Sequence, residues 1–342
     1  MIKISDSKLK NTQLESIQKT MIKKMFKNYL SHRDSYQPYF RKLFRDDSQL
    51  CIYDEYRFMK KLLINELPCL IKDKNYFIKD YIELCKKWDR ENAFGKKFKS
   101  NDEFQEFNST ICKIFSYSKF FEKKRVEIFS VMNVTTCPYC NLNAIQNLDA
   151  TSINPPKTTA DAEHFLPKSI FPLFSSSFGN ILPSCSICNS RFKGKSTTRI
   201  INPRVEEFGS DCRFYYQDLL NLLEKEPDMN SLILKSDESS IKYARIEASK
   251  LLFRLEEVYR ETEDIKGVLE EYFAEFCGYT EDYLINQSLN SWDQLFENMK
   301  KANSKKRFFE KELGSYTQQK FRIDIISEFI ELKKETNTPG AS

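Results

Sequence analysis

Four cysteines near the middle of the chain occur as two C-x-x-C pairs. They are Cys137, Cys140, Cys185 and Cys188. Two such pairs supply four thiolates at the spacing that a tetrahedral structural zinc ion requires. The segment between the pairs is longer than the spacer of an ordinary zinc finger, so we expect a further structural element within it.

That segment holds one of the chain's two histidines. His164 follows Glu163 directly and lies close to Asp161, whereas for His32 we expect a surface or capping role. Hydrolysis of a phosphodiester bond requires a base for the water, a metal ion at the leaving oxygen and cations for the phosphate. His164 is therefore the candidate general base.

A carboxylate and an amide could hold a catalytic metal ion beside this base. Glu163 and Asn189 are the candidate ligands if the strand and the following helix face one another, and Asp161 could replace Glu163. Oxygen ligands suit a hard Mg²⁺ ion that keeps several waters. Because Asn189 directly follows Cys188, the zinc site would fix its position.

Positive charge is concentrated in the same region. Between residues 157 and 204, seven basic and two acidic residues leave an excess of five, which equals the net charge of the whole chain. The basic residues are Lys157, Lys168, Arg191, Lys193, Lys195, Arg199 and Arg204. The rest of the chain is neutral overall, so this segment is the part suited to a polyanion. We expect Lys168, Arg191, Lys193 and Lys195 to contact nucleic acid.

The flanking regions differ from this segment in composition and in the spacing of their apolar residues. Residues 1–130 and 205–342 are rich in Lys, Glu, Leu and Ile, and Gly and Pro are few in the whole chain. Apolar residues recur there at three- and four-residue steps, which predicts amphipathic helices. One such stripe comprises Leu14, Ile17, Met21, Met25 and Tyr29.

The helical periodicity stops at about residue 131, where Thr, Asn, Pro and Ser become frequent. Within residues 131–204 we expect short strands at 143–148, 158–165 and 180–183, and a helix over 184–192 that ends near Gly194. The expected fold class is mainly α with a small α+β core. The expected domains are a helical region at 1–130, the zinc-stabilised core at 131–204 and a helical region at 205–342.

The sequence also bears on where the protein works. It contains no apolar run of about 18 residues and no apolar segment at its start, so we expect a cytoplasmic protein without a membrane span. In that compartment cysteines stay reduced unless they bind metal. We expect the six remaining cysteines to be small buried hydrophobic residues: Cys51, Cys69, Cys85, Cys112, Cys212 and Cys277.

Together these motifs resemble a known family. The string Glu-His-Phe-x-Pro-Lys-Ser from Glu163, followed by Asn180-Ile-Leu and by Cys185-x-x-Cys188-Asn, resembles the HNH endonucleases with their ββα-metal (His-Me finger) core. It is most similar to the cysteine-knuckled branch, which includes the HNH nuclease subunit of Septu-type anti-phage systems. The resemblance covers about residues 131–195.

The resemblance implies a role for each matching residue. His164 would be the base that activates water, Asn180 would orient it, and Glu163 and Asn189 would hold a catalytic Mg²⁺ or Mn²⁺ ion. The four cysteines would bind a structural Zn²⁺. Many members have Asp or His where this chain has Glu163, and a metal-binding His is often found where it has Asn189. Arg191 is our choice for stabilising the transition state, because it lies close to Asn189.

The implied function is hydrolysis of nucleic acid, with DNA favoured over RNA, by the nuclease effector of an anti-phage system. By resemblance to Septu systems, the partner would be an ATPase subunit. Nothing in the helical flanks shows such a partner independently, although their length suits docking to a partner or to a second copy.

Two other functions fit part of the pattern. Cys-Pro-Tyr-Cys at Cys137 is also the active-site string of glutaredoxins, but it should then begin a βαβ unit, and Cys185 and Cys188 would be left unexplained. A zinc module that binds nucleic acid or a partner without cutting would need the cysteines and the basic residues. It would not need Glu163, His164 and Asn180 together.

Overall fold

The described part of the chain is mainly helical, with small two-stranded antiparallel sheets. The computed structural model describes residues 1–47, 50–93, 102–217, 227–272, 313–315 and 317–336. None of the helices in these ranges combines the length and the apolar character needed to cross a bilayer. The expected fold class is therefore confirmed at the level of a mainly helical chain with small sheets.

Contacts divide the chain into two compact units, and both are discontinuous in sequence. Unit 1 comprises residues 1–3, 135–144 and 199–342, and unit 2 comprises residues 4–134 and 145–198. These boundaries differ from the three consecutive segments expected from the sequence. The sequence boundaries followed the local spacing of apolar residues, whereas the two units are defined by which segments pack together.

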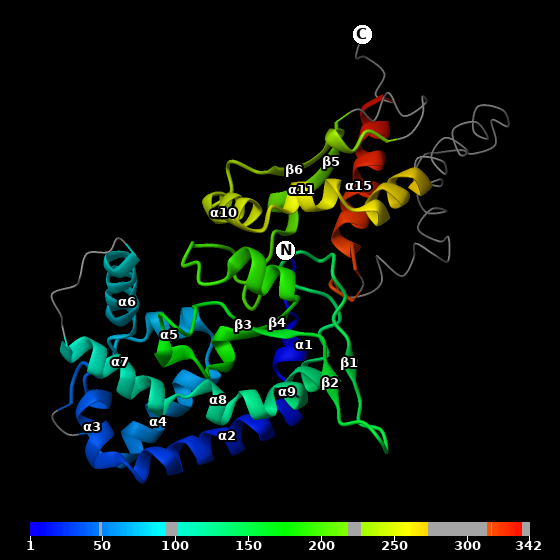
Figure 1. Ribbon diagram of the computed structural model, residues 1–342. Helices are drawn as coiled ribbons and strands as arrows, with labels where there is room; N and C mark the ends of the chain where they lie inside the picture. Colours follow the sequence, from blue (N-terminus) through cyan, green and yellow to red (C-terminus); the bar gives the residue numbers. More distant parts are fainter. Residues whose placement is uncertain (48–49, 94–101, 218–226, 273–312, 316, 337–342) are drawn as a thin grey trace. The chain divides into compact units, whose positions relative to one another are not determined.

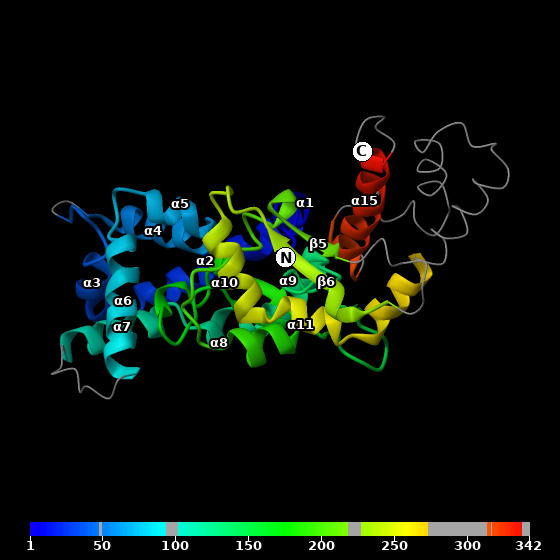
Figure 2. The ribbon, with the colours of Figure 1, turned by 90° about the horizontal axis from the view of Figure 1, so that it is seen from above.

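Helices form most of unit 2. They are α1 (Asp6–Leu9), α2 (Thr12–Leu30), α3 (Arg33–Arg41), α4 (Ile52–Ile64), α5 (Leu67–Lys72), α6 (Ile78–Ala93), α7 (Asp102–Ile114), α8 (Tyr117–Phe120) and α9 (Arg125–Met132). The α6 and α7 helices are neighbours in both ribbon views (Figures 1 and 2). The ring of Trp88 on α6 lies 6.1 Å from that of Phe104 on α7.

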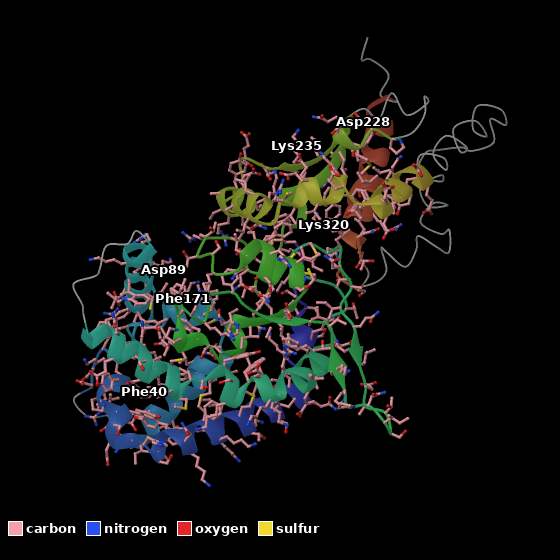
Figure 3. The ribbon with its side chains drawn as sticks, viewed as in Figure 1. Phe40, Asp89, Phe171, Asp228, Lys235 and Lys320 are labelled. Carbon is pink, nitrogen blue, oxygen red and sulfur yellow. The ribbon has the colours of Figure 1, made fainter. Side chains whose placement is uncertain are left out.

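The core of unit 2 is aromatic. The expected stripe on α2 is confirmed, because all five of its apolar residues are buried. Phe40, labelled in Figure 3, has no exposed surface, and its ring lies 5.3 Å from that of Phe58 and 6.2 Å from that of Phe115. Burying side chains of this size contributes about 1.5–3 kcal/mol each relative to exposure. These helices therefore form a stable base for the segments that follow.

Unit 2 also contains two β-hairpins and a short helix. The strands are β1 (Asn147–Leu148), β2 (Lys157–Thr158), β3 (Asp161–His164) and β4 (Ile181–Ser184), and helix η4 spans Ile187–Lys193. The hairpin pairs are β1 with β2 and β3 with β4. The strands are shorter than expected at 143–148 and 158–165. The helix begins three residues later than expected and ends before Gly194, whose φ is 49°.

Unit 1 is built on a third hairpin. Strands β5 (Cys212–Tyr216) and β6 (Leu232–Ser236) pair antiparallel, and the unit also contains α10 (Tyr243–Phe253), α11 (Leu255–Arg260) and α15 (Gln319–Thr336). The main-chain N–H of Phe214 donates to Asp324 on α15, so this helix covers the free edge of β5. Lys320, labelled in Figure 3, lies 2.8 Å from the same carboxylate.

The burial of the remaining cysteines differs from the expectation. Cys85 and Cys212 are buried, but Cys51, Cys69 and Cys112 are exposed, and Cys277 lies outside the described residues. All three have apolar neighbours in sequence, but Cys51 is the N-cap of α4, and Cys69 and Cys112 lie in helices, where successive residues point in different directions. Apolar neighbours in the sequence therefore do not place a helical residue in the core.

Candidate functional site

The β3–β4 hairpin and helix η4 follow one another as a ββα unit (Figure 1). In the hairpin His164 is opposite Ile181, and Asp161 is opposite Ser184. Residues two apart on a strand point to the same face, so Asp161 and Glu163 share a face of β3. Helix η4 packs against β3.

The two acidic side chains of β3 pair with two residues of η4 in matching order. Asn189 Nδ2 donates to Asp161 Oδ2 over 3.1 Å, and Lys193 Nζ lies 2.5 Å from Glu163 Oε1. The second contact is an ion pair and does not have the geometry of a hydrogen bond. A main-chain bond from Gly194 N to Asn189 O spans five residues, which shows that η4 is a widened π-type helix.

His164 is held as a neutral imidazole with a defined tautomer. Its Nε2 lies 2.9 Å from the main-chain oxygen of Ser175. A carbonyl oxygen can only accept, so Nε2 carries the proton and Nδ1 keeps the lone pair. Burial lowers the pKa of His164 to about 4, which keeps the ring neutral at pH 7. The ring of Tyr117 packs against it at 4.9 Å in an edge geometry.

Asn180 holds both ends of the loop between β3 and β4. Its Oδ1 accepts from Leu166 N over 2.7 Å, and its Nδ2 donates to Leu166 O over 3.0 Å and to Phe174 O over 3.1 Å. Phe174 immediately precedes Ser175, whose carbonyl accepts from His164. Asn180 therefore acts on His164 through the loop, since its side-chain hydrogen bonds go to Leu166 and Phe174 and not to the ring.

Three consecutive buried serines fix the same loop to the helices. The hydroxyl groups of Ser175 and Ser176 donate to the main-chain oxygen of Phe115, the latter over 2.9 Å. The hydroxyl group of Ser177 donates to Leu62 O over 2.8 Å. All three side chains therefore satisfy carbonyls at or just beyond the carboxyl ends of α7 and α4, where the helix itself leaves acceptors without donors.

Gly179 completes this attachment because no side chain fits there. A Cβ atom at this position would lie 2.1 Å from the main-chain oxygen of Asn65, which follows α4. The motifs found in the sequence include neither these three serines nor Gly179. The available signal was a run of three serines between Phe174 and Phe178, because hydroxyl groups in an apolar segment need buried acceptors.

The electrostatic environment of Glu163 is that of a buried carboxylate with one cation. Burial raises the pKa of Glu163 to about 7, and the Lys193 ammonium opposes that rise. Lys193 Nζ also donates to the main-chain oxygen of His164 over 2.8 Å. Lys193 is buried, with 1% of its side chain exposed, so it is not the surface cation expected from the sequence.

The Glu163 carboxylate is paired with an ammonium group and is not open to a divalent metal ion in this arrangement. The expected ligand pair does not meet, because the amide of Asn189 contacts Asp161 and the carboxylate of Glu163 contacts Lys193. The donor types are suitable for Mg²⁺ or Mn²⁺, but an ammonium group occupies the carboxylate.

The cysteines form the second part of the site. Cys137, Cys140, Cys185 and Cys188 are all buried, and their sulfur atoms lie within 4.8 Å of one another. Four thiolates are the ligand set of a tetrahedral structural zinc ion. These four cysteines could hold a structural Zn²⁺ ion. No other group of three or more His, Cys, Asp or Glu side chains in the described ranges is arranged to hold a metal.

In each cysteine pair a main-chain N–H group donates a hydrogen bond to one of the sulfur atoms. Leu142 N donates to Cys140 Sγ and Cys188 N donates to Cys185 Sγ, both over 3.4 Å. An N–H donor directed at sulfur favours the thiolate that zinc requires. Asn189 N donates to Cys185 O over 3.0 Å, which fixes the start of η4 directly after the second pair.

The basic residues divide into exposed and buried sets. Arg191, Lys195 and Arg199 are exposed, whereas Arg204 is buried like Lys193. Lys168 is exposed and lies over the ring of Tyr117, 4.0 Å from its centroid. Tyr117 thus contacts both Lys168 and His164, which places a cation close to the imidazole.

Comparisons of the chain with family models, with curated proteins and with solved structures found no match.

Proposed function

We propose that this protein is a metal-dependent HNH endonuclease that hydrolyses phosphodiester bonds of nucleic acid, with DNA as the favoured substrate. The observation that carries the proposal is the hydrogen bond from His164 Nε2 to the carbonyl of Ser175. It directs the lone pair to Nδ1 of a neutral imidazole, which is the form that a general base needs. The ββα order of β3, β4 and η4 supports the same assignment.

His164 would take the proton of the attacking water at Nδ1. The water oxygen forms a bond to phosphorus, the bond from phosphorus to the leaving oxygen breaks, and solvent protonates that oxygen. The Ser175 carbonyl stabilises the imidazolium that forms, because it accepts from Nε2–H in both charge states. A divalent cation, when bound, would stabilise negative charge on the phosphate and on the leaving oxygen.

Exposed cations would hold the substrate. Arg191 and Lys195 extend from η4 and the turn after it, and Lys168 lies on the loop after β3. Contacts of this kind position the backbone and carry no sequence information. Arg191 is the proposed group for the transition-state phosphate, because a guanidinium can bind two phosphate oxygens at once.

We further propose a role as the nuclease effector of an anti-phage system with an ATPase partner. This part of the proposal is supported by the motif resemblance to the nuclease subunit of Septu-type systems. Copurification of the chain with an ATPase from the cells that produce it, and protection of cells that is lost with His164→Ala, would test it.

The nuclease activity is tested with histidine variants. We expect the wild-type protein to nick supercoiled plasmid with Mg²⁺ or Mn²⁺, and His164→Ala to cut about 10²- to 10⁴-fold more slowly. His32→Ala is the matched control, because His32 is exposed and is the only other histidine. Single-stranded DNA and RNA oligonucleotides assayed in parallel decide the substrate class. Equal cutting by wild type and His164→Ala would remove the proposal.

A zinc module that binds nucleic acid or a partner without cutting is the second candidate. The observation that favours it is the buried ion pair of Glu163 with Lys193, since a catalytic carboxylate should be available to metal. Tight binding of DNA by the wild-type protein, without nicking under any divalent metal, would support this function instead.

A further inference from the structure

Lys193 contacts both residues of the Glu163–His164 pair. Its Nζ lies 2.5 Å from Glu163 Oε1 and donates to the main-chain oxygen of His164 over 2.8 Å. The exposed fractions of the Lys193 and Glu163 side chains are 1% and 2%. Lysine is almost never buried so completely unless it is paired. Its neighbours Arg191 and Lys195 are both exposed, so burial is specific to this position.

The ammonium group occupies a position suited to a metal cation. A carboxylate oxygen and a main-chain carbonyl are the hard oxygen ligands that Mg²⁺ and Mn²⁺ take in proteins. Here Glu163 and His164 direct these two oxygens at one cation, and Lys193 supplies it. Asp161 and Asn189 lie on the same strand and helix, directly beside this pair. The oxygen donors for a metal cation are therefore close together, but the ammonium group of Lys193 already supplies the positive charge there.

We propose that Lys193 is a tethered counter-ion that competes with the divalent cation for Glu163, so that it must leave the carboxylate before metal binds. The inference rests on the proposed nuclease function and adds how metal access to that site is controlled. A lysine ammonium is a compact charge on a flexible four-carbon stem, so it can leave without moving the backbone of η4. Without metal the contact keeps Glu163 neutralised and the hairpin joined to the helix.

The competition predicts a gain of metal affinity when Lys193 is removed. If metal binds only the minor state in which Lys193 has left, the apparent dissociation constant equals the intrinsic one divided by the fraction of that state. Minor states of this kind are populated at about 0.1–10%, so we expect Lys193→Met to bind Mn²⁺ at least about 10-fold more tightly. Methionine keeps an unbranched side chain of similar length.

The experiment measures binding of Mn²⁺ alone to the full-length, zinc-loaded protein, from the loss of the free Mn²⁺ signal in electron paramagnetic resonance. Lys195→Met is the matched control, because Lys195 is exposed and two residues away, and it should bind Mn²⁺ like the wild type. Glu163→Gln should weaken binding, and adding Lys193→Met to Glu163→Gln should not restore it. Unchanged or weaker Mn²⁺ binding by folded Lys193→Met would overturn the proposal.

A second measurement uses the wild-type protein and needs no folded variant. Reductive methylation followed by mass spectrometry reports how accessible each lysine is. Lys193 should be protected without Mn²⁺ and reactive at saturating Mn²⁺, while Lys195 should react in both conditions. Protection of Lys193 that persists at saturating Mn²⁺ contradicts the competition.

The outcomes separate this inference from the proposed function. If the wild type nicks plasmid and Lys193→Met has the same metal dependence, the competition by Lys193 is contradicted and the nuclease function stands. Mn²⁺ binding that tightens in Lys193→Met, without nicking by any form of the protein, would support the metal competition and remove the nuclease.

Discussion

The imidazole of His164 and the carbonyl of Ser175 are joined by a hydrogen bond of 2.9 Å that sets the tautomer of the ring. The carbonyl belongs to a loop that Asn180 and three buried serines hold in place. The reactivity expected of His164 therefore depends on Asn180, Ser176 and Ser177 as well, although none of these three side chains is hydrogen-bonded to the imidazole.

Nuclear magnetic resonance of the two histidines tests this relationship directly. At pH 7 we expect His164 to be neutral with its proton on Nε2, and to remain neutral down to about pH 5, because burial lowers its pKa to about 4. His32→Ala assigns the signals. Asn180→Ala should disturb the Nε2–H signal of His164 by releasing Phe174, whereas Asn154→Ala in an exposed loop should not. A proton on Nδ1 would contradict the tautomer.

The pKa shifts of His164 and Glu163 make stability depend on pH in opposite directions. The pKa of His164 falls on folding from about 6.5, so its contribution of about 3 kcal/mol is present above pH 6.5 and is lost as the pH falls through 4. The pKa of Glu163 rises from 4.5 to about 7, so its contribution is present below pH 4.5 and is lost as the pH rises through 7. In urea unfolding, His164→Gln should therefore flatten the loss of stability between pH 6.5 and 4, compared with wild type. An unchanged acid profile would contradict the shift.

Replacing Gly179 by alanine should destabilise unit 2. The added Cβ would meet the main-chain oxygen of Asn65 at 2.1 Å, and a main-chain oxygen cannot move aside as a side chain does. We expect a loss of about 1–3 kcal/mol or more in the free energy of unfolding, together with slower cutting.

Gly267→Ala is the control. Gly267 lies in helical residues 263–272 with nothing within 4 Å of an added Cβ, so alanine should stabilise by up to about 1 kcal/mol. Equal melting temperatures for Gly179→Ala and wild type would refute the close approach.

The purified protein should contain about one zinc ion per chain, because the four buried cysteines supply one tetrahedral ligand set. Cys137→Ser or Cys185→Ser should lose zinc and misfold, since metal binding contributes directly to folding. Cys69→Ser should keep its zinc, because Cys69 is exposed on α5 and outside the cluster. Elemental analysis and thermal unfolding with and without chelator provide the measurement. A zinc-free preparation with the same thermal stability would count against the site.

Nucleic-acid binding should depend on Arg191 and Lys195 and not on the buried Lys193. In a His164→Ala background, changing both exposed residues to alanine should weaken duplex binding at every sequence. It should also flatten the log–log salt dependence by about 1 to 2, since each phosphate contact contributes about 0.9. Lys60 and Lys72, exposed on α4 and α5, provide a control pair of equal charge. An unaltered slope would place the nucleic acid on another surface.

The sequence was sufficient for features that depend on residue type and spacing. The four cysteines meet as their two C-x-x-C pairs predicted, and the α2 stripe is buried as its periodicity predicted. It was not sufficient for Lys193, which sequence places beside Arg191 and Lys195 as one of three equal cations. Only the packing of η4 on β3 shows that Lys193 faces Glu163 while the other two face solvent. The importance of Gly179 likewise depends on Asn65, which is far away in sequence.

The attachment of Ser175, Ser176 and Ser177 to α7 and α4 decides how small a working fragment can be. Cutting the chain to residues 131–204 would keep every residue of the family motif but would remove Phe115 and Leu62. Three buried hydroxyl groups would then lose their acceptors, and the loop that orients His164 would lose its anchor. Transfer of this site to another protein therefore requires the helices that precede it, although they contain none of the motif residues.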